Sequence, residues 1–187
     1  ESPRLSGGLC FARVRCMGRG MNRTVDIVIE DARWQTFGLQ AASERAALAV
    51  VAELGLEPDL YQMVIMGCDD ARIAGLNTEF RDKPVPTNVL SWPSEERGSE
   101  FAGEAPDLPE PGSVDDPAHL GDIAIAWETC AREAAEQGKP MEDHVVHLIV
   151  HGILHLLGYD HIDDADAELM EATEVRILAR LGLSDPY

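Results

Sequence analysis

The sequence predicts an α+β fold, in which a small mixed β-sheet of about four strands packs with about five helices. Two observations predict it. Short runs rich in Val and Ile alternate along the chain with longer segments whose apolar residues have helical spacing. One of these segments, 141–157, is apolar over most of its circumference, so we expect a central helix that carries histidines. The length of 187 residues suits one domain with a substantial core.

The first half of the chain is expected to begin with a disordered extension at residues 1–20, which are rich in Gly, Ser and Arg and have no sustained period. A single domain is expected at 21–187. Strands are predicted from short apolar runs, and helices from apolar spacing bounded by Asp caps or Gly stops. The elements predicted up to residue 92 are strands at 25–29, 61–66 and 87–92 and helices at about 35–54 and from Asp69 or Asp70 to about Phe80.

The second half begins with a long acidic segment, 94–118, which contains four Pro, three Gly and eight acids against a single Arg. Such a composition cannot bury enough apolar surface to fold alone, so we expect a surface loop. Pro140 suits the first turn of the central helix and Gly158 suits its end. The elements predicted beyond the loop are a strand at 121–126 and helices at 128–136, at 141–157 and from Asp163 or Asp164 to about Leu181.

The charge balance limits the classes of partner. The chain has 15 Lys and Arg against 34 Asp and Glu, a net charge of -19, which argues against broad neutralisation of nucleic-acid phosphates. Residues 1–23 carry +4, from five Arg and one Glu, so the remainder carries -23 and any polyanion site there must be local. The four Cys lack paired spacing and are expected to be free thiols. With no apolar run long enough for a bilayer, we expect a cytoplasmic protein that binds neither membranes nor DNA.

The strongest chemical signal is the run HGILHLLGYDH at 151–161. His151 and His155 are four residues apart on a helix, so their imidazoles project from one face, and Gly158 lets the chain turn back and bring His161 to them. Three neutral imidazoles suit Zn²⁺ and leave its fourth position to water. We therefore predict one catalytic zinc ion per chain. The alternative, three separate polar side chains around a helix end, would leave several buried ring nitrogens to be satisfied one by one.

The spacing H-x3-H-x5-H is that of the metzincin peptidases. The Glu that serves them as general base, one residue after the first His, is replaced here by Gly152. A peptidase that lacks this base is poorly equipped, so the same ligands are expected to serve another hydrolysis.

The run at 151–161 resembles the hallmark of the bacterial YbeY endoribonucleases, H-G-x-L-H-L-x-G-Y-D-H, and the resemblance extends over about residues 21–187. It implies a metal-dependent hydrolase that cuts single-stranded RNA, acts in 16S rRNA 3′-end maturation and ribosome quality control, and associates with the small ribosomal subunit and its proteins. It also implies zinc ligands at His151, His155 and His161 and a functional arginine at Arg81, beside the cleft. Further family-like segments are Leu76-Asn77, Lys83, Pro86-Thr87-Asn88-Val89-Leu90-Ser91 and Gly121-Asp122-Ile123.

Two further residues are candidates for catalysis. Arg81 can clamp a phosphate and offset charge in the transition state, or it can form a surface ion pair with Glu79 or Asp82. Asp160 can orient a ligand imidazole or accept a proton from water, and capping of the helix end is an equal alternative.

Other polar residues are expected to have structural roles. His147 is expected to be a structural histidine and His144 to be exposed. Thr87, Asn88 and Ser91 either bind substrate or form a polar strand face.

Three functions stay open at this point: a zinc-dependent endoribonuclease for rRNA, a metzincin-like metallopeptidase, and a ribosome assembly factor whose metal is structural. Because a net charge of -19 repels RNA, the first requires a local basic groove around Arg81, the metal, or a partner protein that supplies the docking surface.

Overall fold

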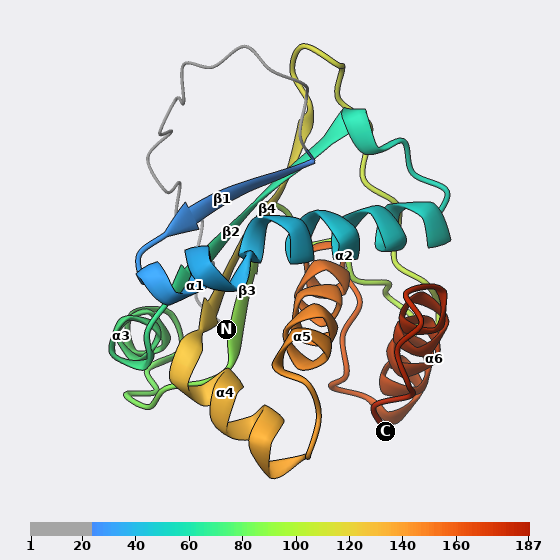
Figure 1. Ribbon diagram of the computed structural model, residues 1–187. Helices are drawn as coiled ribbons and strands as arrows, with labels where there is room; N and C mark the ends of the chain where they lie inside the picture. The colour runs from blue at the N-terminus through green and yellow to red at the C-terminus, as the bar shows by residue number, and fades with distance from the viewer. Residues whose placement is uncertain (1–23) are drawn as a thin grey trace.

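A four-stranded mixed sheet in the order β1-β2-β4-β3 organises the fold in the computed structural model, which describes residues 24–187 (Figure 1). β1 and β2 run parallel, as do β2 and β4, while β3 is an antiparallel edge strand beside β4. The predicted extension at 1–20 lies outside the described residues. The strands are β1 (Val25–Ile29), β2 (Tyr61–Cys68), β3 (Val89–Pro93) and β4 (Ala118–Ala126).

Helices connect and cover the strands, and the predicted α+β class is confirmed. Within residues 24–187 they are α1 (Ala32–Phe37), α2 (Leu39–Glu53), α3 (Asp70–Arg81), α4 (Trp127–Glu136), α5 (Met141–Leu156) and α6 (Asp164–Arg180), with a 3-10 turn at Pro58–Leu60. The prediction of one helix at 35–54 is wrong. Gly38 has a φ of 87° and ends α1 before α2 begins, so the chain breaks near the start of the predicted helix.

The two faces of the sheet carry different helices. Ile65 of β2 and Ile123 of β4 belong to the main core, which they share with α2, α5 and α6. Met66 and Ala124, one residue further along each strand, point to the other face and pack with α3. Figure 1 shows α6 beside α5, at the opposite side of the molecule from α3. Helix α5 is central, as predicted.

Two glycines let α5 lie close to the sheet. A Cβ added at Gly152 of α5 would be 3.0 Å from Cδ1 of Ile123, so this position faces the core. Gly121 of β4 has a φ of 141°, and a Cβ there would be 2.2 Å from the Trp92 carbonyl oxygen and 2.9 Å from the Leu156 side chain. The end of α5 that carries the histidines therefore rests where β4 meets the end of the edge strand β3.

The segment at 94–117 joins β3 to β4 without a helix or strand of its own, apart from an isolated bridge between Ser113 and Asp116. It is nevertheless attached to the domain. The Tyr61 hydroxyl donates to the Pro109 carbonyl at 3.0 Å, and the Arg97 guanidinium donates to the Leu156 carbonyl at 3.3 Å. The acidic loop is thus anchored at the end of α5. None of the helices in residues 24–187 combines the length and apolar character that crossing a bilayer requires.

Candidate metal centre

The three predicted metal ligands converge at the end of α5. One ring nitrogen each from His151, His155 and His161 lies within 4.8 Å of the other two. Nε2 of His151 and Nε2 of His155 are 3.0 Å apart, as expected for residues one helical turn apart on one face. The His161 ring lies 5.5 Å from that of His151 and 5.0 Å from that of His155, between ring centroids. The predicted cluster of three imidazoles is thus formed.

A helix-ending turn brings His161 back to the cluster. Gly158 has a φ of 93°, and its N–H donates to the His155 carbonyl at 3.1 Å while the Tyr159 N–H donates to the Leu154 carbonyl at 3.0 Å. This pair of hydrogen bonds is the Schellman motif, which reverses the chain at a left-handed residue. A side chain at 158 would also meet the backbone of Arg97 at 2.8 Å, so glycine is required there for two reasons.

The ring of His155 is held in the orientation that metal binding needs. Its Nδ1 lies 3.0 Å from the Tyr159 carbonyl oxygen, which can only accept, so Nδ1 carries the proton and Nε2 has the free lone pair. Burial, together with the neighbouring His151 and His161, lowers the pKa of His155 to about 4. The imidazole is therefore neutral at pH 7 and able to act as a ligand.

His151 lies beside a carboxylate that the sequence analysis missed. Its Nδ1 lies 3.2 Å from Oε1 of Glu174 on α6, a residue with no exposed surface. Burial by itself would raise the pKa of Glu174, but the adjacent imidazoles of His147 and His151 outweigh it and lower that pKa to about 2. An ionised carboxylate at this distance favours a proton on Nδ1 of His151. The signal in the sequence is an acid on the apolar stripe formed by Met170, Ile177 and Leu178.

The donor set fits a divalent metal ion. With Nδ1 protonated in both rings, the Nε2 atoms of His151 and His155 face each other with lone pairs at 3.0 Å, which is repulsive unless a proton or cation lies between them. Zinc–nitrogen bonds of about 2.1 Å place tetrahedral ligands about 3.4 Å apart, close to this separation. Three neutral nitrogen donors suit Zn²⁺ and leave a coordination position open.

Comparison with known proteins decides the family. A sequence model described as endoribonuclease YbeY matches residues 25–182. The chain belongs to the YbeY endoribonuclease family. The resemblance in the histidine motif is thereby confirmed, and the family's motif residues form the cluster just described.

Curated relatives match nearly the whole chain. Endoribonuclease YbeY of Cereibacter sphaeroides is 63% identical over 167 residues, which cover 89% of this chain and 100% of that protein. Endoribonuclease YbeY of Ruegeria pomeroyi is 56% identical over 167 residues, which cover 88% of this chain and 98% of that protein. The solution structure of TM1509 from Thermotoga maritima aligns with a TM-score of 0.50 at 21% identity, over 87% of this chain and 97% of that one. This likeness shows a common fold.

Asp160 and Arg81 have different positions relative to the YbeY motif histidines. The Asp160 carboxylate accepts a hydrogen bond of 2.7 Å from the His161 N–H, which secures the turn. Arg81 is exposed at the end of α3, on the opposite face of the sheet from α5, and within residues 24–187 its side chain forms no hydrogen bond or ion pair. The alternative of an ion pair with Glu79 or Asp82 is therefore wrong.

A buried polar network accounts for two other predicted residues. His144 is buried, not exposed as predicted, because α4 covers it and its Nε2 lies 2.9 Å from Oε2 of Glu133. The same carboxylate accepts a hydrogen bond of 2.9 Å from Nδ2 of Asn88. Asn88 therefore joins the start of β3 to α4 and α5.

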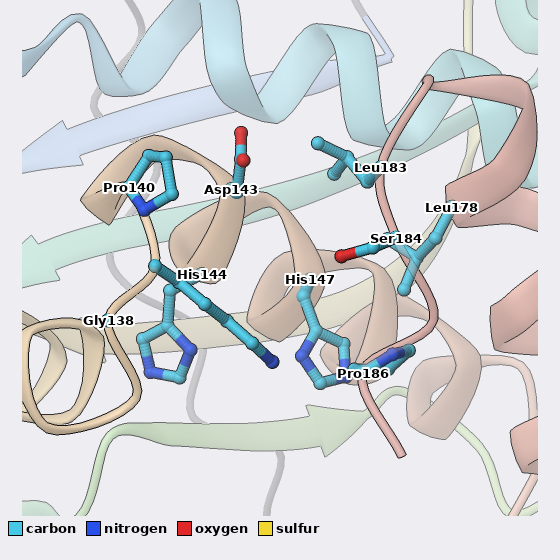
Figure 2. Close-up of a pocket in the computed structure, with 10 residues that line it drawn as sticks. Gly138, Pro140, Asp143, His144, His147, Leu178, Leu183, Ser184 and Pro186 are labelled. Atoms are coloured by element: carbon cyan, nitrogen blue, oxygen red, sulfur yellow. The ribbon is translucent and has the colours of Figure 1, made fainter.

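Two cavities flank α5. The larger, of about 230 Å³, lies near the start of the helix and is bordered by His144, His147 and the tail residues Leu183, Ser184 and Pro186 (Figure 2). It does not include the three ligands. The smaller, of about 170 Å³, borders the ligand-bearing turn at 158–160 and is lined by several acids, which disfavour a bound phosphate: Glu104, Asp160, Asp163 and Asp166.

Proposed function

We propose that this chain is a zinc-dependent, single-strand-specific endoribonuclease that acts in the cytoplasm in 16S rRNA 3′-end maturation and ribosome quality control. Its proposed partners are single-stranded RNA and the small ribosomal subunit with its associated proteins. The observation that carries the proposal is the convergence of three imidazoles on one point, formed by the motif that this chain shares with a family of endoribonucleases.

The position of Gly152 argues against the peptidase alternative. In a metzincin-like site, this residue would be a glutamate that acts on water at the metal. Here a Cβ at 152 would point at Ile123 in the core and would lie 3.0 Å from its Cδ1. A glutamate at that position would start into the core and would have to displace the Ile123 side chain.

The proposed mechanism assigns separate tasks to the residues of the site. When bound, zinc supplies Lewis acidity and lowers the pKa of water towards 7. His155 keeps its Nε2 lone pair available because its Nδ1–H is held by the Tyr159 carbonyl. Asp160 holds the turn that carries His161, since its carboxylate already accepts the His161 N–H. We therefore propose that Asp160 acts on the chemistry through this turn.

Arg81 is proposed to bind a phosphate of the substrate RNA. The Phe80 and Trp92 rings are in contact, with centroids 5.4 Å apart, so the end of α3 lies at the edge strand β3. The Leu156 end of α5 approaches the same region from the other face, next to the Trp92 carbonyl. An RNA strand that crosses this edge can meet both the metal centre and Arg81. Lys83 is also exposed there, which gives the acidic domain a local basic spot.

The test combines element analysis of the purified protein with cleavage of a labelled single-stranded RNA before and after chelation. We expect one zinc per chain, cleavage that is lost on chelation and restored by zinc, and no cleavage by a folded His155→Ala variant. Arg81→Ala is expected to lower kcat/KM by about 100-fold. Its unfolding free energy should change by less than about 0.5 kcal/mol because the side chain is exposed.

Arg72→Ala is the matched control, since Arg72 is exposed in the first turn of the same helix, and it should cleave like the wild type. Metal-independent cleavage would contradict the proposal. Full support of ribosome maturation by a folded His155→Ala protein without nuclease activity would instead favour an assembly factor with a structural metal.

A further inference from the structure

Glu174 of α6 is a buried carboxylate surrounded by three groups from two other parts of the chain. Its Oε1 lies 3.2 Å from Nδ1 of His151 and 3.2 Å from Nε2 of His147, both on α5. Its Oε2 accepts a short hydrogen bond from the Tyr187 hydroxyl. The two imidazoles flank Oε1 without the alignment of a full hydrogen bond, so electrostatic attraction dominates these contacts.

The tail of the chain completes this arrangement. Figure 2 shows Pro186 beside His147, with Leu183 and Ser184 on the same segment alongside α5. The Tyr187 ring is nearly perpendicular to the His147 ring, at 83°, with centroids 6.2 Å apart. The tail thus brings a hydroxyl donor to the carboxylate that faces the metal ligand His151.

A metal ligand needs its free nitrogen in a defined place. Neutral imidazole has two tautomers, and only the one with the proton on Nδ1 leaves the Nε2 lone pair of His151 directed at His155 and His161. A carboxylate next to Nδ1 favours that tautomer, fixes the ring orientation and increases the basicity of Nε2.

We propose that Glu174 is a positioning residue of the metal centre, which holds His151 in its ligating tautomer and is itself held by the Tyr187 hydroxyl. This inference deepens the proposed function and rests on its metal site, but it does not depend on which substrate is cut.

The zinc affinity of a Glu174 variant distinguishes a positioning role from a purely structural one. Within residues 24–187 no Lys or Arg contacts the carboxylate, so in the metal-free protein it is a buried charge held only by imidazole and hydroxyl groups. Glu174→Gln keeps the shape of the side chain and an oxygen that can accept from Tyr187, but it removes the charge that attracts the two imidazoles. With a purely structural Glu174, this replacement would lower stability but leave the zinc affinity of the folded protein unchanged, whereas with a positioning Glu174 it also lowers the zinc affinity.

The experiment uses the full chain and three substitutions. The zinc dissociation constant is measured by competition with a chromophoric chelator. The visible spectrum of the cobalt-substituted protein reports the coordination of the metal. The tautomer of His151 is measured by nitrogen NMR of the metal-free protein. We expect Glu174→Gln to weaken zinc binding by about 10- to 100-fold. Its His151 should show a mixture of tautomers, and its metal-free unfolding temperature should be equal or lower, because the attraction between the carboxylate and the two imidazoles is lost. Tyr187→Phe should weaken zinc binding by a smaller factor.

Glu168→Gln is the matched control, because Glu168 is an exposed residue of the same helix, and it should bind zinc like the wild type. An unchanged dissociation constant and an unchanged His151 tautomer in Glu174→Gln would overturn the inference. If Glu174→Gln does not fold, Tyr187→Phe decides through the same two measurements. Zinc binding without RNA cleavage by the wild type would contradict the proposed function and leave this inference standing.

Discussion

Substitution of Gly152 distinguishes the nuclease from the peptidase most directly. Gly152→Glu restores the H-E-x-x-H sequence of a metallopeptidase, and Gly152→Ala adds only a methyl group. In both variants, the new Cβ would point at Ile123 and would lie 3.0 Å from its Cδ1. The expected result is loss of the fold for the glutamate and near-normal behaviour for the alanine.

The magnitudes follow from the packing. Overpacking a core position costs about 1–3 kcal/mol. Alanine recovers about 1 kcal/mol through its higher helix propensity, so its net cost is about 0–2 kcal/mol. A glutamate buried without a partner must be protonated, which at pH 7 costs about 3.7 kcal/mol. With overpacking, the total is about 5–7 kcal/mol, comparable to the whole stability of many domains.

Urea unfolding followed by circular dichroism measures both variants, and a peptidase assay on unstructured peptides is run on the same samples with zinc. The reasoning would be refuted by a Gly152→Glu protein that keeps wild-type stability and hydrolyses peptides, because residue 152 would then face the metal and not the sheet.

Three further outcomes are expected. Gly121→Ala should lower the free energy of unfolding in urea by at least about 3 kcal/mol, because strain at positive φ adds to a Cβ placed 2.2 Å from the Trp92 carbonyl oxygen. Its control, Gly75→Ala, lies in open space on α3 and should raise this free energy by about 1 kcal/mol. Equal effects of the two substitutions would contradict this reasoning. Burial raises the pKa of the Cys68 thiol to about 12, so Cys68 stays protonated at pH 8. Cys68 and the buried Cys130 should therefore resist alkylation by iodoacetamide in the folded protein. Rapid alkylation of either residue, measured by peptide mass spectrometry, would be inconsistent with this. Zinc at 100 times its dissociation constant should stabilise the protein by about 2.7 kcal/mol and raise the unfolding temperature by about 5–10 °C; identical calorimetric scans with and without zinc would exclude the metal site.

The regular elements were largely predictable because their signals are local. Asp69 caps α3 by accepting the Arg72 N–H at 2.7 Å, as its place before an apolar helical run indicates. The break at Gly38 was missed because the apolar residues on both sides continue in helical spacing, so the pattern does not reveal that this glycine adopts a left-handed conformation.

The candidate site was predictable in part. The three ligands follow from spacing, since two lie one helical turn apart and the third follows a glycine. Glu174 was missed because it lies on another helix, 13 to 23 residues beyond the three candidate ligands, where an acid within an apolar stripe was not recognised. His144 was misplaced because its burial depends on α4, a helix whose contact with α5 no local pattern specifies.

The sequence by itself determined the α+β class, most of the elements and the candidate metal ligands, because helix periodicity and glycine conformations act over a few residues. Only the tertiary structure decided that Gly152 faces Ile123, that Glu174 lies beside His151 and that Arg81 lies across the sheet from α5. Such relations depend on which helix covers which face, and packing between distant segments, not local conformational preference, sets that.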